Sequence, residues 1–180
     1  MTINTTIPFS VPPPLAHFLV SPDAYLAANP SLAALIVSGI IIHKHRVLLI
    51  QRAAHDGFPL KWECPGGQVD TTDETVLHGL CREVHEETGL VVAHVVDVAD
   101  TLEFDGQEGE RWRKVTFLVV LDGGEVPAVR LSAEEHEDAV WATDEEVVAG
   151  KCEGREIEFA YEGQKQTVLD ALRRAGNGQC

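Results

Sequence analysis

The chain has 180 residues, with 29 acidic and 14 basic side chains and a formal net charge of −15 at pH 7. This length is typical of one domain that buries its own core without disulfide or metal staples, and an apolar content of 44% argues against wholesale disorder. The negative charge argues against a protein that grips nucleic acid through its phosphates or docks on anionic lipid, because such proteins present a basic face.

The sequence shows no clear targeting or cross-linking feature. The longest apolar stretch, residues 32–42, is shorter than the roughly 20 residues that span a bilayer. The first basic residue is Lys44, so the N-terminus lacks the basic region of a signal peptide. The four cysteines are widely spaced and form no CxxC pair. We therefore expect a cytoplasmic protein that does not bind a membrane.

The N-terminal part of the sequence predicts an arm that precedes one domain. Residues 1–16 hold four of the nine prolines and few charges, which is typical of an extended or disordered arm. We expect a single domain over residues 17–176. Near its start, Ser21-Pro22 is a typical N-cap and first residue of a short helix that stops before Pro30, and a loop is the alternative.

Two strands joined by a turn are predicted next. Residues 34–42 and 47–50 are apolar runs rich in β-branched residues, and the polar residues 43–46 between them predict a short turn. Such runs indicate burial on both faces, so we expect a sheet that is covered on both sides.

A strand, a glycine-rich loop and a helix follow. Residues 62–64 predict a short strand that enters a loop at Gly66-Gly67, and residues 71–88 predict a helix with apolar residues at helical spacing. Thr71-x-x-Glu74 has the pattern of a capping box, and Gly89 stands where a glycine typically ends a helix.

The rest of the chain predicts further strands and two more helices. Residues 91–104, 112–121 and 139–142 have the alternating or continuous apolar pattern of strands. Thr143-x-x-Glu146 is a second capping box that opens a short helix, and residues 164–174 predict a C-terminal helix.

Three glutamates on the 71–88 helix suggest chemistry. Glu83, Glu86 and Glu87 are related by i, i+3 and i+4, so they project from one side of the helix. A divalent cation would relieve their mutual repulsion, because Mg²⁺ prefers carboxylate oxygens and water. The preceding glycines would let the backbone approach and add a carbonyl. A solvated, charged helix face is the alternative.

The same helix carries a longer pattern. Glu74 is followed after seven residues by Arg82-Glu83-Val84-x-Glu86-Glu87-x-Gly89-Leu90, which resembles the signature of the Nudix hydrolases. That signature reads glycine, five residues, glutamate, seven residues, then Arg-Glu-aliphatic-x-Glu-Glu-x-Gly-aliphatic. The match covers about 24 residues, and the strand order extends the resemblance more weakly over residues 32–172.

One spacing departs from that signature. Six residues, not five, separate Gly67 from Glu74. Either the loop carries a one-residue insertion, or Asp73 takes the place of the glutamate. We favour the insertion, because Glu74 keeps the family's spacing to Arg82 and a loop absorbs one residue more cheaply than a helix does.

The resemblance implies a fold and an activity. The fold would be an α/β/α sandwich, a mixed β-sheet between helices. The activity would be metal-dependent hydrolysis of the pyrophosphate linkage of a nucleoside diphosphate joined to another moiety. Glu83, Glu86, Glu87 and the carbonyl of Gly66 would hold Mg²⁺ or Mn²⁺. Cations would also explain how an acidic protein binds a polyanion.

The resemblance further implies roles around the metal. Arg82 would be an orienting residue paired with Glu74. Glu83, Glu86 or a more distant glutamate would help to deprotonate the attacking water.

Two residues outside the helix are further candidates. Glu135, in the acidic loop 134–138, is a candidate base or metal ligand, and a solvated acidic loop is the alternative. Arg52, at the end of a predicted strand, resembles an arginine that contacts substrate phosphates in some family members, and a surface salt bridge is the alternative.

A non-catalytic nucleotide sensor with the same fold is the competing hypothesis. The three box glutamates favour an enzyme, and the altered spacing after Gly67 favours the sensor. The partner would be a small nucleotide rather than a long nucleic acid. The loops 53–61, 105–111 and 134–138 would read the leaving group, but they carry no motif that selects one substrate. Family members are often dimers, so a homodimer is one alternative for the quaternary state.

Overall fold

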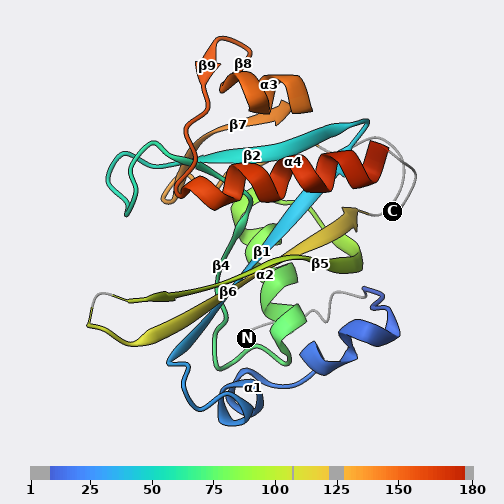
Figure 1. Cartoon of the computed structure of the whole chain (residues 1–180), viewed down its shortest axis with the longest axis vertical. Helices are drawn as coiled ribbons and strands as arrows, with labels where there is room; N and C mark the ends of the chain where they lie inside the picture. The colour runs from blue at the N-terminus through green and yellow to red at the C-terminus, as the bar shows by residue number, and fades with distance from the viewer. Residues whose placement is uncertain (1–8, 107, 122–127, 177–180) are drawn as a thin grey trace.

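The computed structural model describes residues 9–106, 108–121 and 128–176 (Figure 1). Its centre is a mixed, seven-stranded sheet in which the main strand order is β3-β2-β1-β6-β5, with β4 paired to β1 and β7 paired to β2. The pair β1·β6 runs parallel, whereas β1·β2 and β5·β6 run antiparallel. The strands of this sheet are β1 (Ala34–His43), β2 (Arg46–Arg52), β3 (Trp62–Glu63), β4 (Gly66–Gln68), β5 (Val92–Asp105), β6 (Arg111–Leu121) and β7 (His136–Ala142).

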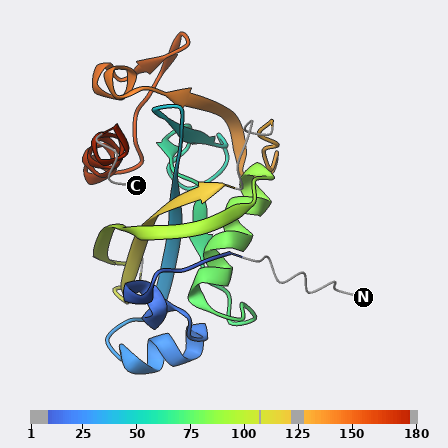
Figure 2. The same cartoon turned by 90° about the vertical axis from the view of Figure 1, so that its right-hand side faces the viewer.

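Helices cover both faces of the sheet. Figure 2 shows α2 (Val76–Thr88) and α4 (Glu162–Gly176) on opposite sides of the strands. Each helix buries its apolar face in a separate core cluster, Leu80 and Val84 in one and Val168 and Leu172 in the other. The expected sandwich, a mixed sheet between helices, is thereby confirmed. The remaining elements are α1 (Pro22–Ala28), α3 (Asp144–Ala149) and a small sheet of β8 (Lys151–Cys152) and β9 (Arg155–Glu156).

Strand burial follows the sequence pattern. The interior of β1 is buried on both faces, and Val47 to Ile50 of β2 have no solvent exposure. The turn between them places Lys44 and His45 in the left-handed region, with φ of 48° and 62°. The two predicted strands and their turn are therefore correct.

The N-terminal segment differs from the expected arm over residues 1–16. Residues 1–8 lie outside the described part of the chain, but from Phe9 onward the segment packs on the domain. The Ser10 amide donates to the carbonyl of Ala93 (2.8 Å), and a 3₁₀ helix spans Pro13–Phe18 with Leu15 buried. The prolines are compatible with this packing because Pro at the first helical positions needs no N–H partner.

The helix α2 begins later than residue 71. Its N-cap is Thr75, whose side chain accepts from the amide of His78, and its last turn ends on Gly89 at φ 70°. The preceding residues form a turn instead, in which the Asp70 carboxylate accepts from the amide and hydroxyl of Thr72. Short polar side chains of this kind compete with helical hydrogen bonding, so the expected capping box of Thr71 and Glu74 is wrong.

The second capping box is present. Thr143 and Glu146 exchange both side-chain–backbone hydrogen bonds at the start of α3. Among the helices that the structure describes, none is long and apolar enough to cross a membrane.

Candidate active site

The glutamates of α2 lie against the glycine strand β4. The register of β4 on β1 brings Gly66 beside Ser38 and Gly67 beside Val37. From there the amide of Gly66 donates to Oε2 of Glu87 (2.6 Å). A Cβ on Gly67 would lie 2.6 Å from Oε2 of Glu83. Gly67 can lie this close to Glu83 because it carries no side chain, and a Cβ on Gly66 would instead meet the carbonyl of Val37 on β1.

Arg82 ties the carboxylates together. Its Nη1 donates to Oε1 of Glu83 (2.7 Å) and to Oε2 of Glu86 (2.9 Å). Its Nε and Nη2 form a bidentate pair with the two oxygens of Asp73 (2.8 and 3.0 Å). Hydrogen bonding to Asp73, then the charge of Glu83 and the hydrogen bonds to Glu83 and Glu86, raise the pKa of the Arg82 guanidinium. The Arg82 guanidinium thus orients the carboxylates of Asp73, Glu83 and Glu86.

The expected pair of Arg82 with Glu74 does not form. The Glu74 side chain is 64% exposed, and Nε2 of His78 lies 3.7 Å from its carboxylate. Asp73 is only 6% exposed and also accepts from the amide of Asp70 (2.8 Å). The geometry therefore favours the other alternative, in which Asp73 takes the glutamate's place. The one residue that is extra relative to the signature then lies between Asp73 and the start of α2. It therefore does not change the spacing of the residues within the helix.

Glu87 is the most buried of the three helix glutamates. Burial raises the pKa of Glu87 to about 9, and the nearby carboxylates of Glu63, Glu83 and Glu135 act in the same direction, while the Gly66 amide opposes them. Burial also raises the pKa of Glu83 despite its contact with Arg82. A divalent cation among these groups would favour their ionised forms.

The loop before β7 brings Glu135 close to Glu87. Glu83, Glu86, Glu87 and Glu135 are called the carboxylate cluster below. The Ser132 amide donates to the carbonyl of Glu87 (3.2 Å), and the Ala53 amide donates to the carbonyl of Glu135 (2.8 Å). The loop is therefore attached both to the end of α2 and to the residue that follows β2. Ligand atoms of Glu87, Glu135 and His136 all lie within 4.8 Å of one another.

The buried side chain of His136 was given no role by the sequence. Its Nε2 lies 3.6 Å from Oε1 of Glu63 and 3.8 Å from Oε1 of Glu87. Burial would raise the pKa of Glu63, but His136, Lys114 and Arg52 together hold it below its ordinary value. The signal in the sequence was alternation at the start of β7, where exposed Glu135 is followed by an inward-facing residue.

Arg52 holds its own loop. Its Nη1 donates to Glu63, its Nη2 to Asp56 and its Nε to the carbonyl of Gly57. Three of its five N–H groups are therefore used within the protein. The contacts match the salt-bridge alternative, and they also place the guanidinium beside Glu63 at the edge of the carboxylate cluster.

The acidic segment 134–138, expected as a loop, is a loop only up to Glu135, because β7 begins at His136. Glu137 accepts from the amide of Ala54 (2.8 Å), and Asp138 pairs with Arg155. Hydrogen bonding to Arg155 lowers the pKa of Asp138. These two acids hold the start of β7 in place, whereas Glu135, just before the strand, lies near Glu87 and His136.

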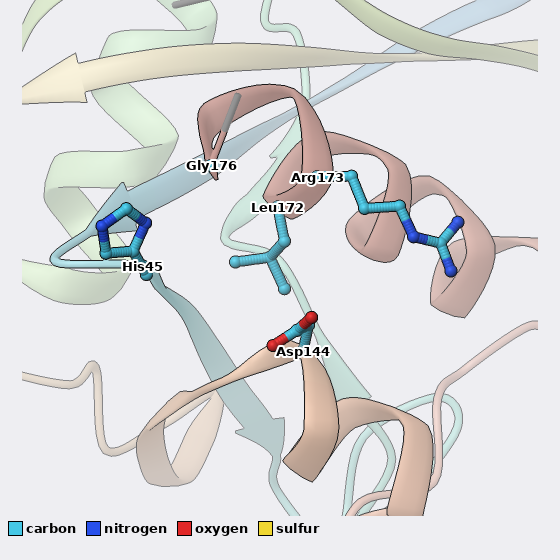
Figure 3. Close-up of a pocket in the computed structure, with 5 residues that line it drawn as sticks. All are labelled: His45, Asp144, Leu172, Arg173 and Gly176. Atoms are coloured by element: carbon cyan, nitrogen blue, oxygen red, sulfur yellow. The ribbon is translucent and has the colours of Figure 1, made fainter. Parts of the chain in front are cut away.

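A cavity of about 350 Å³ lies elsewhere in the fold (Figure 3). Its lining comes from the β1–β2 turn, the start of α3 and the end of α4, and consists of His45, Asp144, Leu172, Arg173 and Gly176. None of these residues belongs to the carboxylate cluster. The chemistry that the carboxylates offer is therefore separate from this cavity.

Comparison with known proteins gives consistent matches. A family model described as the NUDIX domain matches residues 33–161. A MutT-like protein of Streptomyces ambofaciens is 33% identical over 153 residues, which cover 83% of this chain and 84% of that protein. A putative 8-oxo-dGTP diphosphatase 2 of Mycobacterium tuberculosis (strain ATCC 25618 / H37Rv) is 34% identical over 119 residues, 64% of this chain and 77% of that protein. The crystal structure of a MutT protein from Methanosarcina mazei Go1 is 29% identical, with a TM-score of 0.55, and covers 79% of this chain and 94% of its own.

Proposed function

The chain belongs to the Nudix family, and we propose that it is a metal-dependent hydrolase that cleaves the pyrophosphate linkage of a nucleoside diphosphate joined to another moiety. One observation carries this proposal. Glu83 and Glu87 converge on the glycine strand β4, and the loop before β7 brings a further carboxylate, Glu135, to the same place.

The donor set fits a hard divalent cation. Glu83, Glu86 and Glu87 offer carboxylate oxygens, and the carbonyl of Gly66 is a further oxygen donor in the proposed site. Such ligands suit Mg²⁺ and Mn²⁺. The buried carboxyl of Glu87, surrounded by other acids, is a group that needs a compensating cation in order to ionise. When bound, the cation neutralises phosphate charge and activates water.

Other side chains of the site are proposed to orient the ligands and to accept the proton. Arg82, held by Asp73, orients Glu83 and Glu86. A general base must reach water, and Glu86 (56% exposed) and Glu135, which is also exposed, meet that condition. We assign proton acceptance from the attacking water to one of these two. Glu74, exposed and away from Arg82, is left without a catalytic role in this proposal.

The proposed substrate is a small nucleotide. A net charge of −15 disfavours a long RNA. The Mycobacterium relative is named for 8-oxo-dGTP, so oxidised nucleoside triphosphates belong in any test. Arg52 is proposed to contact substrate phosphates through its two remaining N–H groups, at the edge of the cluster.

The test is product release from a panel of nucleotides with Mg²⁺ or Mn²⁺. The panel holds 8-oxo-dGTP, unmodified triphosphates, ADP-ribose, a nucleotide sugar and a dinucleoside polyphosphate. Glu86→Gln should lower kcat about 10²-fold or more. The matched control is Glu145→Gln, an exposed glutamate of α3, which should leave kcat unchanged. Cation binding without turnover of any panel member would instead indicate a nucleotide sensor.

A further inference from the structure

His136 is a buried imidazole that lies near two carboxylates but has no hydrogen-bond partner among the described residues. Its side chain is 1% exposed at the start of β7. Neither Nδ1 nor Nε2 has a hydrogen-bond partner among the residues that the structure describes. Buried ring nitrogens are nearly always paired, so an unpaired imidazole indicates that something else binds there.

The surroundings of Nε2 are anionic and spaced for an ion. Oε1 of Glu63 lies at 3.6 Å and Oε1 of Glu87 at 3.8 Å, both too far for a hydrogen bond. Two ligands of one first-row cation can be separated by up to about 4.2 Å, twice the usual ion–ligand distance. The distance from Nε2 to Oε1 of Glu87 lies within that span, and Glu135 has a carboxylate oxygen within 4.8 Å of both residues.

The backbone holds His136 in this position. The His136 amide donates to the carbonyl of Ser132 (2.9 Å), and the Ser132 amide donates to the carbonyl of Glu87 (3.2 Å). The loop before His136 and the end of α2, which carries Glu87, are therefore hydrogen-bonded to each other through the backbone. These hydrogen bonds fix the position of the imidazole relative to the Glu87 carboxylate. Glu63 is already paired with Arg52, which leaves Glu87 as the carboxylate near Nε2 that can share an ion with His136.

We propose that Nε2 of His136 is a nitrogen ligand of the cation held by Glu87, and that it makes the site prefer Mn²⁺ over Mg²⁺. The preference follows because imidazole suits transition-metal ions, whereas Mg²⁺ prefers oxygen. This inference rests on the proposed function for the presence of a cation. It adds a residue outside the signature helix and a cation selectivity that carboxylates alone would not give.

Pulsed electron paramagnetic resonance of the Mn²⁺-loaded full chain tests the ligand directly. A coordinated imidazole gives a ¹⁴N coupling that changes to a ¹⁵N coupling when the protein is labelled with ¹⁵N-histidine. We expect this coupling in the unmodified chain and its loss in His136→Gln. The matched control is His85→Gln, because His85 is exposed on α2 next to Glu86; this variant should keep the coupling.

Cation affinity supplies a second readout. His136→Gln should weaken Mn²⁺ binding about 10-fold or more, while Mg²⁺ binding changes much less. A merely structural histidine would weaken both ions equally. The isotope experiment on the unmodified chain needs no variant, so it decides the matter even if His136→Gln does not fold. Mn²⁺ binding without a histidine coupling would overturn this inference and leave the proposed function standing, whereas absence of Mn²⁺ and Mg²⁺ binding would overturn both.

Discussion

Replacing Asp73 by asparagine tests how the box arginine is held. Asp73 is 6% exposed and pairs with Arg82 through both carboxylate oxygens. The asparagine side chain would keep one acceptor but turn an NH₂ group toward the guanidinium, so one hydrogen bond and the charge attraction are lost.

The magnitude follows from this geometry. Breaking a buried ion pair costs about 3–5 kcal/mol. Arg82 is 30% exposed and retains Glu83 and Glu86, so we expect a smaller loss of about 2–3 kcal/mol in the free energy of unfolding. For a domain of this size, that loss lowers Tm by roughly 5–10 °C.

The assay is thermal and urea unfolding followed by circular dichroism, with Glu74→Gln as the matched control. The Glu74 side chain is 64% exposed, so its substitution should change the unfolding free energy by less than about 0.5 kcal/mol. Asp73→Asn should also lower kcat, because Arg82 would no longer fix Glu83 and Glu86. A larger loss in Glu74→Gln than in Asp73→Asn would refute the assignment of Asp73 as the partner of Arg82.

Three further outcomes are expected. Gly66→Ala should destabilise the fold by about 3 kcal/mol or more in urea unfolding, because the new Cβ would lie 2.1 Å from the carbonyl of Val37. Gly57→Ala is the control and should leave the unfolding free energy nearly unchanged, because nothing lies within 4 Å of its Cβ. Saturating Mn²⁺ should raise Tm in a calorimetric scan, by an amount equivalent to about 2.7 kcal/mol at 100 times Kd, and an equal rise in Glu87→Gln would contradict the assigned ligand. Thr143→Ala should cost about 1 kcal/mol through loss of the α3 capping box, and an unchanged urea midpoint would show that the cap contributes nothing.

The sequence predicted those elements whose causes are local. The apolar runs of β1 and β2, the capping box at Thr143 and the terminating Gly89 each depend on residues that are neighbours in the chain. The convergence of three glutamates on one side of α2 also follows from helical spacing alone.

The start of α2 was predicted wrongly because two local signals compete. Thr71-x-x-Glu74 and Thr75 are both plausible caps, and the side chain of Asp70 decides between them by closing a turn onto Thr72. The same turn carries Asp73 toward Arg82. Spacing along the chain could not show which acid would reach the guanidinium.

The surroundings of His136 depend on tertiary packing. Its neighbours Glu63 and Glu87 come from β3 and α2, and only the sheet order and the loop anchored by Ser132 bring the three together. Similarly, the contacts of Phe9 and Leu15 with the core depend on surfaces that the N-terminal residues do not reveal. A single sequence shows the residue types and their periodicity, but it does not show which residues that are distant in the chain come into contact.

The central claim is that the α2 carboxylates support metal-dependent cleavage of a pyrophosphate linkage. The most direct measurement is ³¹P nuclear magnetic resonance of the nucleotide panel during incubation with the protein and Mg²⁺ or Mn²⁺. We predict that the signals of the linked phosphates of the substrate decrease while signals of a nucleoside monophosphate or of free pyrophosphate appear. A chelator and the Glu86→Gln substitution should each abolish these changes. Unchanged spectra for every nucleotide with both ions, or equal turnover in Glu86→Gln, would contradict the claim.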